Sequence, residues 1–508
     1  MKKNDFLFLL MSTPLWLSCS SADTEKYVGL MPFTENTTLE QKVHIAAHVV
    51  PTDAQLAWQK MEKTCFICYG INTFTDREWG TGKEDLSLFN PSELDAGQWA
   101  RTAKANGMKM ILLTCKHHDG FCLWPSKYTK FSVASTPWKD GKGDIVKEVA
   151  EACEKEGLKF AVYLSPWDMN NPAYGTEAYN DFFVNQLTEL LTQYGKVDEV
   201  WFDGACGEGP NGKKQVYDFQ RYYQVIRELQ PEAVIAIMGP DVRWVGTETG
   251  YGRDTEWSVI PTSEQIPEKV AAASQQKPGS GTYIPKSGGN TRKDLGSRAV
   301  LAKSQGVAWY PSEVDVSIRP GWYYHASQDE KVKSPQKLID IYYSSVGKNS
   351  LLLLNLPPDK RGLIHENDCK NLSEMTRILN ETFANNLLKE ASCKKVRIQK
   401  LIDNDLTTYW SGEGKELVFH YDAPVTFDRV LLQENITQGQ RIENFKIEYK
   451  DGDKWKLLTE ATTVGYKRLL RTKKVTAQEV RLTLTQSRDV PQLSEFGLYL
   501  SSPEEKMK

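Results

Sequence analysis

The chain has 508 residues, of which 63 are Lys or Arg and 66 are Asp or Glu, so its formal net charge is −3. A charge this close to zero gives no electrostatic case for binding nucleic acid. Hydrophobic residues make up 40 % and charged residues 25 %, which excludes a largely disordered chain. The length predicts about two to four domains at roughly 100–200 residues each.

The first residues have the pattern of a bacterial lipoprotein signal. A lysine pair precedes a mostly apolar stretch over 6–17, which is too short to span a bilayer. The run LSCS at 17–20 resembles the lipobox, which implies cleavage before Cys19 and lipidation of its thiol. We expect a signal peptide over 1–18, a linker over 19–43 and a protein held in the bacterial cell envelope, in the periplasm or at the outer membrane, by its lipid anchor alone. Ordinary secretion is the alternative.

Between about residues 60 and 360, short apolar runs alternate with segments of helical spacing. Near-continuous apolar runs are typical of parallel strands that are buried on both faces. About eight βα repeats in roughly 300 residues predict a (β/α)8 barrel, and a doubly wound sheet is the alternative. One strand between 238 and 307 has no clear pattern. The expected strands are 66–69, 110–114, 158–164, 199–202, 234–238, 307–310 and 351–356.

The pattern changes near residue 365. Residues 366–388 are expected to form a helical connector. Short alternating runs over 389–502, separated by polar turns, predict an all-β sandwich. The fold class is therefore α/β, a (β/α)8 barrel over 44–365 followed by an all-β sandwich domain.

The cysteines do not indicate a disulfide scaffold, because eight remain in a long chain once Cys19 is set aside. Cys65 and Cys68 form a C-x-x-C spacing inside an apolar run. No second ligand pair follows at zinc spacing, so a redox or zinc role is disfavoured.

Polar side chains stand where several predicted strands end. They are His117, His118, Asp168, Asp203, Glu313 and Asp315. The ends of barrel strands meet at one rim, where active sites lie, so we expect these groups to converge. Carboxylates, a His pair and several Trp residues at one rim suit the binding and hydrolysis of a sugar. Consecutive strand residues point to opposite faces, so the His pair is an awkward site for one metal ion.

Several short blocks carry a more specific pattern. In chain order they are NTFTDREWG at 72–80, KHHDGF at 116–121, YLSPWD at 163–168, WFDG at 201–204, GPDVRWVG at 239–246, WYPSEVD at 309–315 and LLLLNLPP at 351–358. Together they resemble the α-L-fucosidases of glycoside hydrolase family 29, most of all the branch that prefers α1-3 and α1-4 fucosides. The resemblance implies a retaining exo-glycosidase that releases terminal α-L-fucose from fucosylated glycans, without a cofactor.

The resemblance also implies roles for individual residues. Asp203 matches the nucleophile of the family. Glu248 is the best match to the acid/base, although Thr247 stands where the family commonly has Asn, and Glu256 and Glu313 are further candidates. The implied substrate-binding residues are Glu78, Trp79, His117, His118, Trp167, Trp201, Cys68 and Glu313.

The first predicted strand departs from the family pattern at Cys68. The family carries His in the sequence Phe-Ile-His-Phe-Gly, whereas this chain has FICYG at 66–70. A thiol is a weak hydrogen-bond donor and a poor replacement for an imidazole. Two alternatives therefore stay open, a hydrolase of a related sugar and a glycan-binding lipoprotein that has lost turnover. The intact pair Asp203 and Glu248 favours an enzyme.

The C-terminal region carries a second resemblance. LIDNDLTTYW at 401–410 and LSEFGLY at 493–499 are similar to discoidin-type modules, the coagulation factor type C domains. The resemblance implies carbohydrate binding and a structural calcium ion, to which Asp403, Asp405 and Glu495 would contribute. A rigid spacer without a ligand is the alternative.

Overall fold

The computed structural model describes residues 26–273, 292–412 and 416–505. The expected signal peptide over 1–18 and the lipidation site Cys19 lie outside these ranges. Within them, no helix combines the length and the apolar character needed to cross a bilayer.

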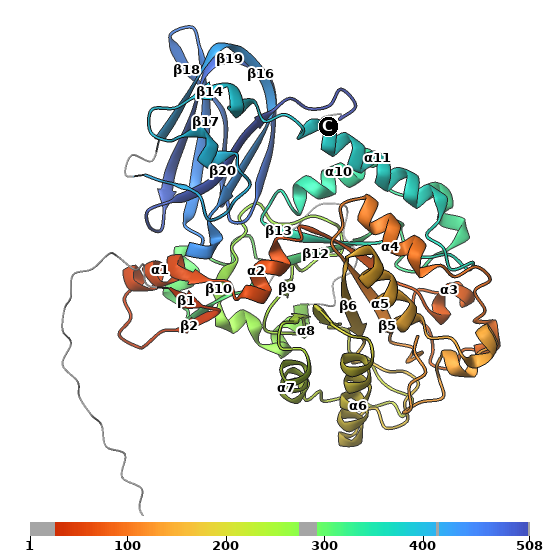
Figure 1. Ribbon diagram of the computed structural model, residues 1–508. Coiled ribbons are helices and arrows are strands. Elements are labelled where there is room, and N and C mark those ends of the chain that lie inside the picture. Colours follow the sequence, from red (N-terminus) through yellow and green to blue (C-terminus); the bar gives the residue numbers. More distant parts are fainter. Residues whose placement is uncertain (1–25, 274–291, 413–415, 506–508) are drawn as a thin grey trace, which may run out of the picture.

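Eight parallel strands form a nearly closed barrel (Figure 1), in the order β8-β7-β6-β5-β4-β13-β12-β9. The strands are β4 (Lys63–Ile67), β5 (Met110–Lys116), β6 (Lys159–Leu164), β7 (Glu199–Phe202), β8 (Val234–Ile237), β9 (Arg243–Trp244), β12 (Ser312–Ser317) and β13 (Ser350–Asn355). The last gap is bridged between Ala236 and Val242. The predicted barrel is confirmed, and the doubly wound alternative is wrong.

Helices surround this barrel, and several of them begin at side-chain caps. They include α4 (Ala96–Ala105), α5 (Ile145–Glu156), α6 (Glu177–Gln193), α7 (Phe219–Leu229) and α10 (Pro335–Ser344). Asp95, Asp144 and Asp218 each accept a hydrogen bond from a backbone N–H in the first turn of the helix that follows. Helix α5 ends where Gly157 takes a left-handed conformation at φ 69°, which glycine adopts at little cost.

Two strands differ from the expectation. The run 307–310 is not part of the barrel, because β11 (Gly306–Trp309) pairs with β10 (Val259–Pro261) and β2 (Leu30–Pro32) in an antiparallel sheet. The barrel strand is β12, which hydropathy does not mark because Glu313 and Asp315 alternate with its apolar residues. The strand that had no clear pattern is β9, which has only two residues.

The expected linker over 19–43 is wrong for its described part. Strand β1 (Tyr27–Val28) pairs with β3 (Val49–Val50), and β2 pairs with β11. Helix α1 (Leu39–His48) follows and starts with a capping box between Thr38 and Gln41. This segment is folded onto the barrel and begins the first domain.

The strands of the barrel separate two apolar clusters. Along β7, Val200 and Phe202 pack against the surrounding helices, and Trp201 packs inside the barrel. Side chains alternate between the faces of a strand, so Glu199 and Trp201 share the inner face and Asp203 continues that line to the mouth.

A helical connector (Figure 1, teal) and a sandwich (mostly blue) complete the chain. Helix α11 (Glu366–Thr382) lies within the segment 366–388 that was expected to connect the two domains. The sandwich strands are β14 (Ala391–Ser392), β15 (Trp410–Ser411), β16 (Glu416–Glu434), β17 (Ile442–Asp451), β18 (Lys454–Thr462), β19 (Arg468–Ser487) and β20 (Gln492–Tyr499). They form a seven-stranded sheet of antiparallel pairs around its own apolar core, as predicted.

Glu256 lies at the junction of the two domains. Its carboxylate is held by Arg243 of β9 and by Arg253, and all three side chains are buried. Its backbone N–H donates to Thr463 at 3.0 Å, and its carbonyl accepts from Gln440 at 3.0 Å. Glu256 therefore connects the barrel to the sandwich.

Candidate active site

Asp203 follows β7 at the mouth of the barrel. One carboxylate oxygen accepts the Tyr163 hydroxyl at 2.9 Å, and the other accepts the Ala205 N–H at 2.7 Å. The side chain is 25 % exposed, so the oriented carboxylate stays open to a ligand. This is the arrangement that a nucleophile needs, since attack requires both a fixed direction and access.

His118 faces Asp203 in a defined tautomer. The Ser165 hydroxyl donates to the Trp167 carbonyl at 2.7 Å, so the 2.7 Å bond between Ser165 and His118 must have Nδ1–H as its donor. Burial and the charge of Lys116 lower the pKa of His118 to about 3. Nε2 is therefore unprotonated and lies 3.8 Å from an Asp203 oxygen. The two acceptors can share the hydroxyl group of a sugar.

His117 lies beside His118 and not on the opposite face. Their ring centroids are 4.0 Å apart, and His117 also contacts Tyr163 and Tyr323. Strand alternation does not apply here, because β5 ends at Lys116. Burial lowers the pKa of His117 well below its usual value. The expectation that the two rings point apart is wrong, and both enter the pocket as neutral imidazoles.

Glu248 comes from the loop after β9. Its carboxylate accepts the Trp322 indole N–H at 3.4 Å. Burial, followed by the charges of Asp203 and Glu78, raises the pKa of Glu248 to about 7. A carboxyl group that keeps its proton near neutral pH beside an oriented carboxylate can act as a general acid.

Glu78 is tied to the same loop as Trp322. Its carboxylate accepts the Trp322 backbone N–H at 2.8 Å and bonds His325 at 2.6 Å. The other nitrogen of His325 bonds Asp76 at 2.6 Å. Burial alone would lower the pKa of His325, but the two carboxylates raise it above its usual value. Gly321 packs directly against Glu78, where any side chain would collide with the carboxylate.

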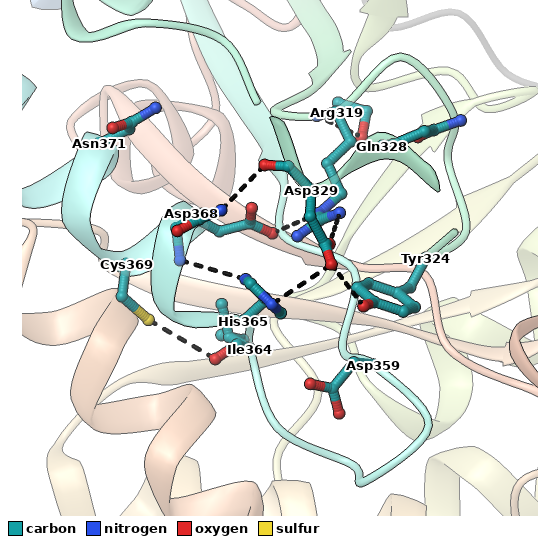
Figure 2. A network of polar contacts seen from close by, with 12 residues as sticks. Arg319, Tyr324, Gln328, Asp329, Asp359, Ile364, His365, Asp368, Cys369 and Asn371 are labelled. Atoms are coloured by element: carbon teal, nitrogen blue, oxygen red, sulfur yellow. Dashed lines mark hydrogen bonds and ion pairs between the residues drawn. The ribbon is translucent and has the colours of Figure 1, made fainter. Parts of the chain in front are cut away.

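The loop that carries Trp322 and His325 is anchored by a buried arginine (Figure 2). Arg319 donates from Nε to Asp368 of α11 and from Nη1 to Asp329, both at 2.8 Å. The Tyr324 hydroxyl donates to Asp329 at 3.2 Å, and its ring lies 4.6 Å from the guanidinium. The positions of Glu78 and Glu248 therefore depend on ion pairs made beneath the loop.

The three tryptophans that were expected to hold the sugar lie at different depths. Trp79 is 57 % exposed and meets Trp167 edge to face, with 5.4 Å between ring centroids. The Trp167 ring lies against His118. Trp201 is buried, stacks on Tyr163 and donates its N–H to Glu313 at 2.8 Å. Trp79 and Trp167 therefore form the rim, whereas Trp201 supports the floor.

Carboxyl groups in the barrel accept indole N–H donors in a repeated pattern. The pairs are Trp58 with Glu199 at 2.7 Å, Trp201 with Glu313 at 2.8 Å, Trp244 with Asp315 at 2.7 Å and Trp322 with Glu248 at 3.4 Å. Burial raises the pKa of Glu199 to about 8 and those of Glu313 and Asp315 well above their usual values. These three carboxyl groups therefore keep their protons to a higher pH than ordinary carboxyl groups do.

Neither of the two further acid/base candidates fits that role. Glu313 is fully buried beneath the pocket, so its expected place among the sugar-binding residues is wrong. Glu256 forms ion pairs with two buried arginines at the domain junction, so its carboxylate is already occupied there. Glu248 is the candidate that the structure brings to Asp203.

Cys68 packs inside the barrel near its mouth. Its thiol accepts the Thr114 hydroxyl at 3.7 Å. Burial raises the pKa of this thiol, and the charges of Glu78 and Asp203 contribute, so Cys68 is directed toward the pocket as a neutral group. Cys65 packs in the outer cluster on the other side of β4, and both thiols are free. This separation excludes a disulfide between them.

The expected calcium ligands come together only in part. Burial, with the nearby charge of Asp403, raises the pKa of Glu495 to about 7. One buried oxygen of Glu495 has no hydrogen-bond partner among the described residues. The Asp405 carboxylate instead accepts from the N–H and hydroxyl of Thr407. An orphaned carboxylate oxygen beside Asp403 suits a cation, and calcium binding here stays a prediction.

The sequence reasoning missed Trp322, His325 and Tyr163, which position Glu248, Glu78 and Asp203. Tyr163 begins the block YLSPWD and had a signal, because it lies near the end of a predicted strand. Trp322 and His325 lie in an irregular segment that follows β12, and no periodicity marks them.

We expect Glu313→Gln to change how stability depends on pH. An unfolded Glu titrates near about pH 4.3, whereas folded Glu313 keeps its proton to a much higher pH. The folded state thus binds a proton that the unfolded state releases, and stability falls by about 1.4 kcal/mol per pH unit above the unfolded pKa. Gln keeps the acceptor for Trp201 without titrating.

Thermal unfolding midpoints from pH 5 to pH 8 measure this effect. The Glu313→Gln midpoint should exceed the wild-type midpoint most at pH 8, with a gap that closes toward pH 5. Glu151→Gln, at an exposed position on α5, should keep the wild-type slope. A Glu313→Gln protein that is less stable by the same amount at every pH would contradict a neutral Glu313.

Comparisons with known proteins agree with this geometry. A model of the α-L-fucosidase family matches residues 43–382, and a model of the F5/8 type C domain matches residues 390–496. The α-L-fucosidase 1 of Arabidopsis thaliana is 41 % identical over 471 residues, which cover 89 % of this chain and 87 % of the plant protein.

Solved structures extend the comparison to the whole fold. A Bacteroides ovatus protein, provisionally named an α-L-fucosidase, is 50 % identical with a TM-score of 0.84 and covers 96 % of this chain and 80 % of its own. A Ruminococcus gnavus family 29 fucosidase in complex with fucose is 31 % identical with a TM-score of 0.78, covering 90 % and 96 %. This chain therefore belongs to the α-L-fucosidase family of glycoside hydrolases, family 29, and carries a discoidin-type domain at its C-terminus.

Proposed function

We propose that the protein is a retaining exo-α-L-fucosidase that acts on α1-3 and α1-4 linked fucose by double displacement. The observation that carries this proposal is the pairing of two unlike carboxyl groups at the barrel mouth. Asp203 is partly exposed and oriented by two donors. Glu248 is more enclosed, and its pKa is raised to about 7. Paired carboxyl groups with divided roles are what glycoside hydrolysis requires, and no cofactor enters the reaction.

In the first step, an oxygen of Asp203 attacks the anomeric carbon and the glycosidic bond breaks. Glu248 gives its proton to the leaving oxygen, which departs as an alcohol. In the second step, Glu248 takes a proton from water, the water oxygen attacks the anomeric carbon, and the ester bond to Asp203 breaks.

The coupling between the two carboxyl groups suits this change of role. The negative charge of Asp203 helps to raise the pKa of Glu248 in the free enzyme. That charge disappears once Asp203 is esterified to the sugar, so the pKa of Glu248 falls. Glu248 is then ionised when it must act as a base.

We expect Asp203→Ala to lose several orders of magnitude in kcat with the fold intact, since the covalent intermediate cannot form. Glu248→Gln should lose far more activity on natural glycans than on aryl fucosides, whose leaving groups need little protonation. Azide should restore aryl fucoside turnover of Glu248→Ala as a fucosyl azide. The wild-type fall in kcat/KM above about pH 7 should be absent in Glu248→Gln.

Glu313→Gln is the matched control, because this carboxyl group is buried beneath the pocket. Glu313→Gln should keep the wild-type dependence of its rate on the leaving group, and azide should not raise its turnover. Near wild-type rates in Asp203→Ala would contradict the assignment of Asp203 as the nucleophile. If the protein binds glycans without turnover, neither the wild type nor any variant would show activity. The anomer that NMR detects first in the product tests retention.

The family branch that the sequence resembles supports the linkage preference, and Cys68 bears on which sugar is accepted. We expect release of fucose from α1-3 and α1-4 oligosaccharides and little from α1-2 or α1-6. If the pocket has kept fucose as its substrate, Cys68→His should raise kcat/KM on fucosides by roughly twofold to tenfold, the worth of one neutral hydrogen bond. Cys68→Ser controls for a small polar group. If activity were confined to aryl glycosides of a related sugar, that sugar and not fucose would be the substrate.

We also propose that Cys19 carries a lipid that attaches the protein to the cell envelope. The lipobox-like run LSCS at 17–20 supports this proposal. Radiolabelled fatty acid should enter the wild-type protein and not Cys19→Ala. Equal labelling of the two proteins would indicate a lipid elsewhere, and labelling of neither would indicate ordinary secretion.

A further inference from the structure

Two imidazoles and a carboxylate meet where α1 packs against the sandwich, away from the catalytic residues. His44 and His48 lie one turn apart on α1, and Asp489 follows β19. An Asp489 oxygen lies 3.5 Å from Nδ1 of His44 and 3.2 Å from Nε2 of His48. We propose that these residues bind a divalent transition-metal ion, with Zn²⁺ preferred, and that the ion fastens α1 to the C-terminal domain.

The spacing of the three atoms suits one shared ion. All of them lie within 4.8 Å of one another. Two ligands at about 2.0–2.1 Å from a tetrahedral zinc ion are roughly 3.3 Å apart, close to both distances found here. Residues four apart on a helix present their side chains on one face. Nitrogen ligands with a carboxylate favour zinc over calcium or magnesium, which prefer oxygen.

The ligand atoms are also held in the form that binds a metal. Nδ1 of His48 donates to the His44 carbonyl at 2.8 Å, which fixes the proton there and leaves Nε2 unprotonated. The other oxygen of Asp489 accepts the Val490 N–H at 2.6 Å, so the oxygen that faces the imidazoles is available.

The site is open enough for an ion to enter. The side chain of His44 is 53 % exposed and that of Asp489 is 27 % exposed, while His48 is buried. Water would complete the coordination, as it does at zinc sites with three protein ligands. Arg441 is nearby and donates to the carbonyls of Val490 and Gln438. Its positive charge opposes a cation, so we expect weaker binding than at cysteine-rich zinc centres.

This cluster is distinct from the other groups of titratable side chains. Across residues 26–273, 292–412 and 416–505, no second group of His, Cys, Asp or Glu side chains meets the same spacing. Neither the fucosidase reaction nor the sugar pocket uses its members. A metal ion here would join α1 to the C-terminal domain by coordinate bonds to residues of both.

The test is metal binding to the full-length protein after chelator treatment. Cobalt(II), whose visible spectrum reports coordination, and zinc, measured by calorimetry, are titrated into wild type, His44→Ala, Asp489→Asn and His420→Ala. His420 is the matched control, because it also lies beside a carboxylate, that of Glu479, at 3.2 Å. His48 is left unchanged because it is buried.

We expect one equivalent of zinc to bind wild type and His420→Ala, with a rise in the unfolding midpoint. Zinc binding should be weaker by tenfold or more in His44→Ala and in Asp489→Asn, because each variant lacks one of the three ligands. Loss of a group that only hydrogen-bonds to a metal ligand already weakens metal binding by about tenfold or more. Equal binding in all four proteins would place the ion elsewhere. No binding to wild type, or an Asp489→Asn effect on the midpoint that zinc does not change, would show that the cluster is a polar contact between α1 and the sandwich and not a metal site.

Discussion

The removal of carboxyl groups from water inside the barrel is the constraint on which the active site depends. Glu199, Glu313 and Asp315 lie on inner strand faces, where burial opposes their ionisation. Each meets this cost by keeping a proton and by accepting an indole N–H. The floor of the pocket is therefore polar in composition and neutral in charge. A charged floor would repel the carboxylate of Asp203, which has to stay ionised to act as a nucleophile.

The same constraint explains why Glu248 and Asp203 differ. Both stand at the mouth, but Asp203 receives two strong donors, whereas Glu248 receives one long bond from Trp322. Hydrogen bonds stabilise the ionised form, and burial opposes it. The division of labour between nucleophile and acid thus follows from the number of donors. Arg319 anchors the loop that carries Trp322, so the ion pairs beneath this loop also affect the position of Glu248.

The sequence predicted those parts of the site that stand at the ends of regular strands. Asp203 follows an apolar run, so its position at the barrel mouth and the direction of its side chain could be predicted from the sequence. Strand β12 was misplaced because its inward side chains are acidic, and the apolar run before it belongs to another sheet. His325 and Trp322 lie in a loop whose course is set by tertiary ion pairs. Local pattern carries no information about such contacts, and the same holds for Asp489 beside α1.

The junction between the domains also buries polar groups, but here they are ion pairs and not neutral carboxyl groups. Glu256 joins the barrel to the sandwich through two arginines and two backbone bonds. Buried ion pairs add little net stability, but they penalise any arrangement that leaves one charge unpaired. Glu256 lies only a few residues beyond Glu248 in the same connection between β9 and β10. Fixing the sandwich against Glu256 therefore limits the conformations of the loop that carries Glu248, the proposed catalytic acid, so the C-terminal domain would support catalysis even without a ligand of its own.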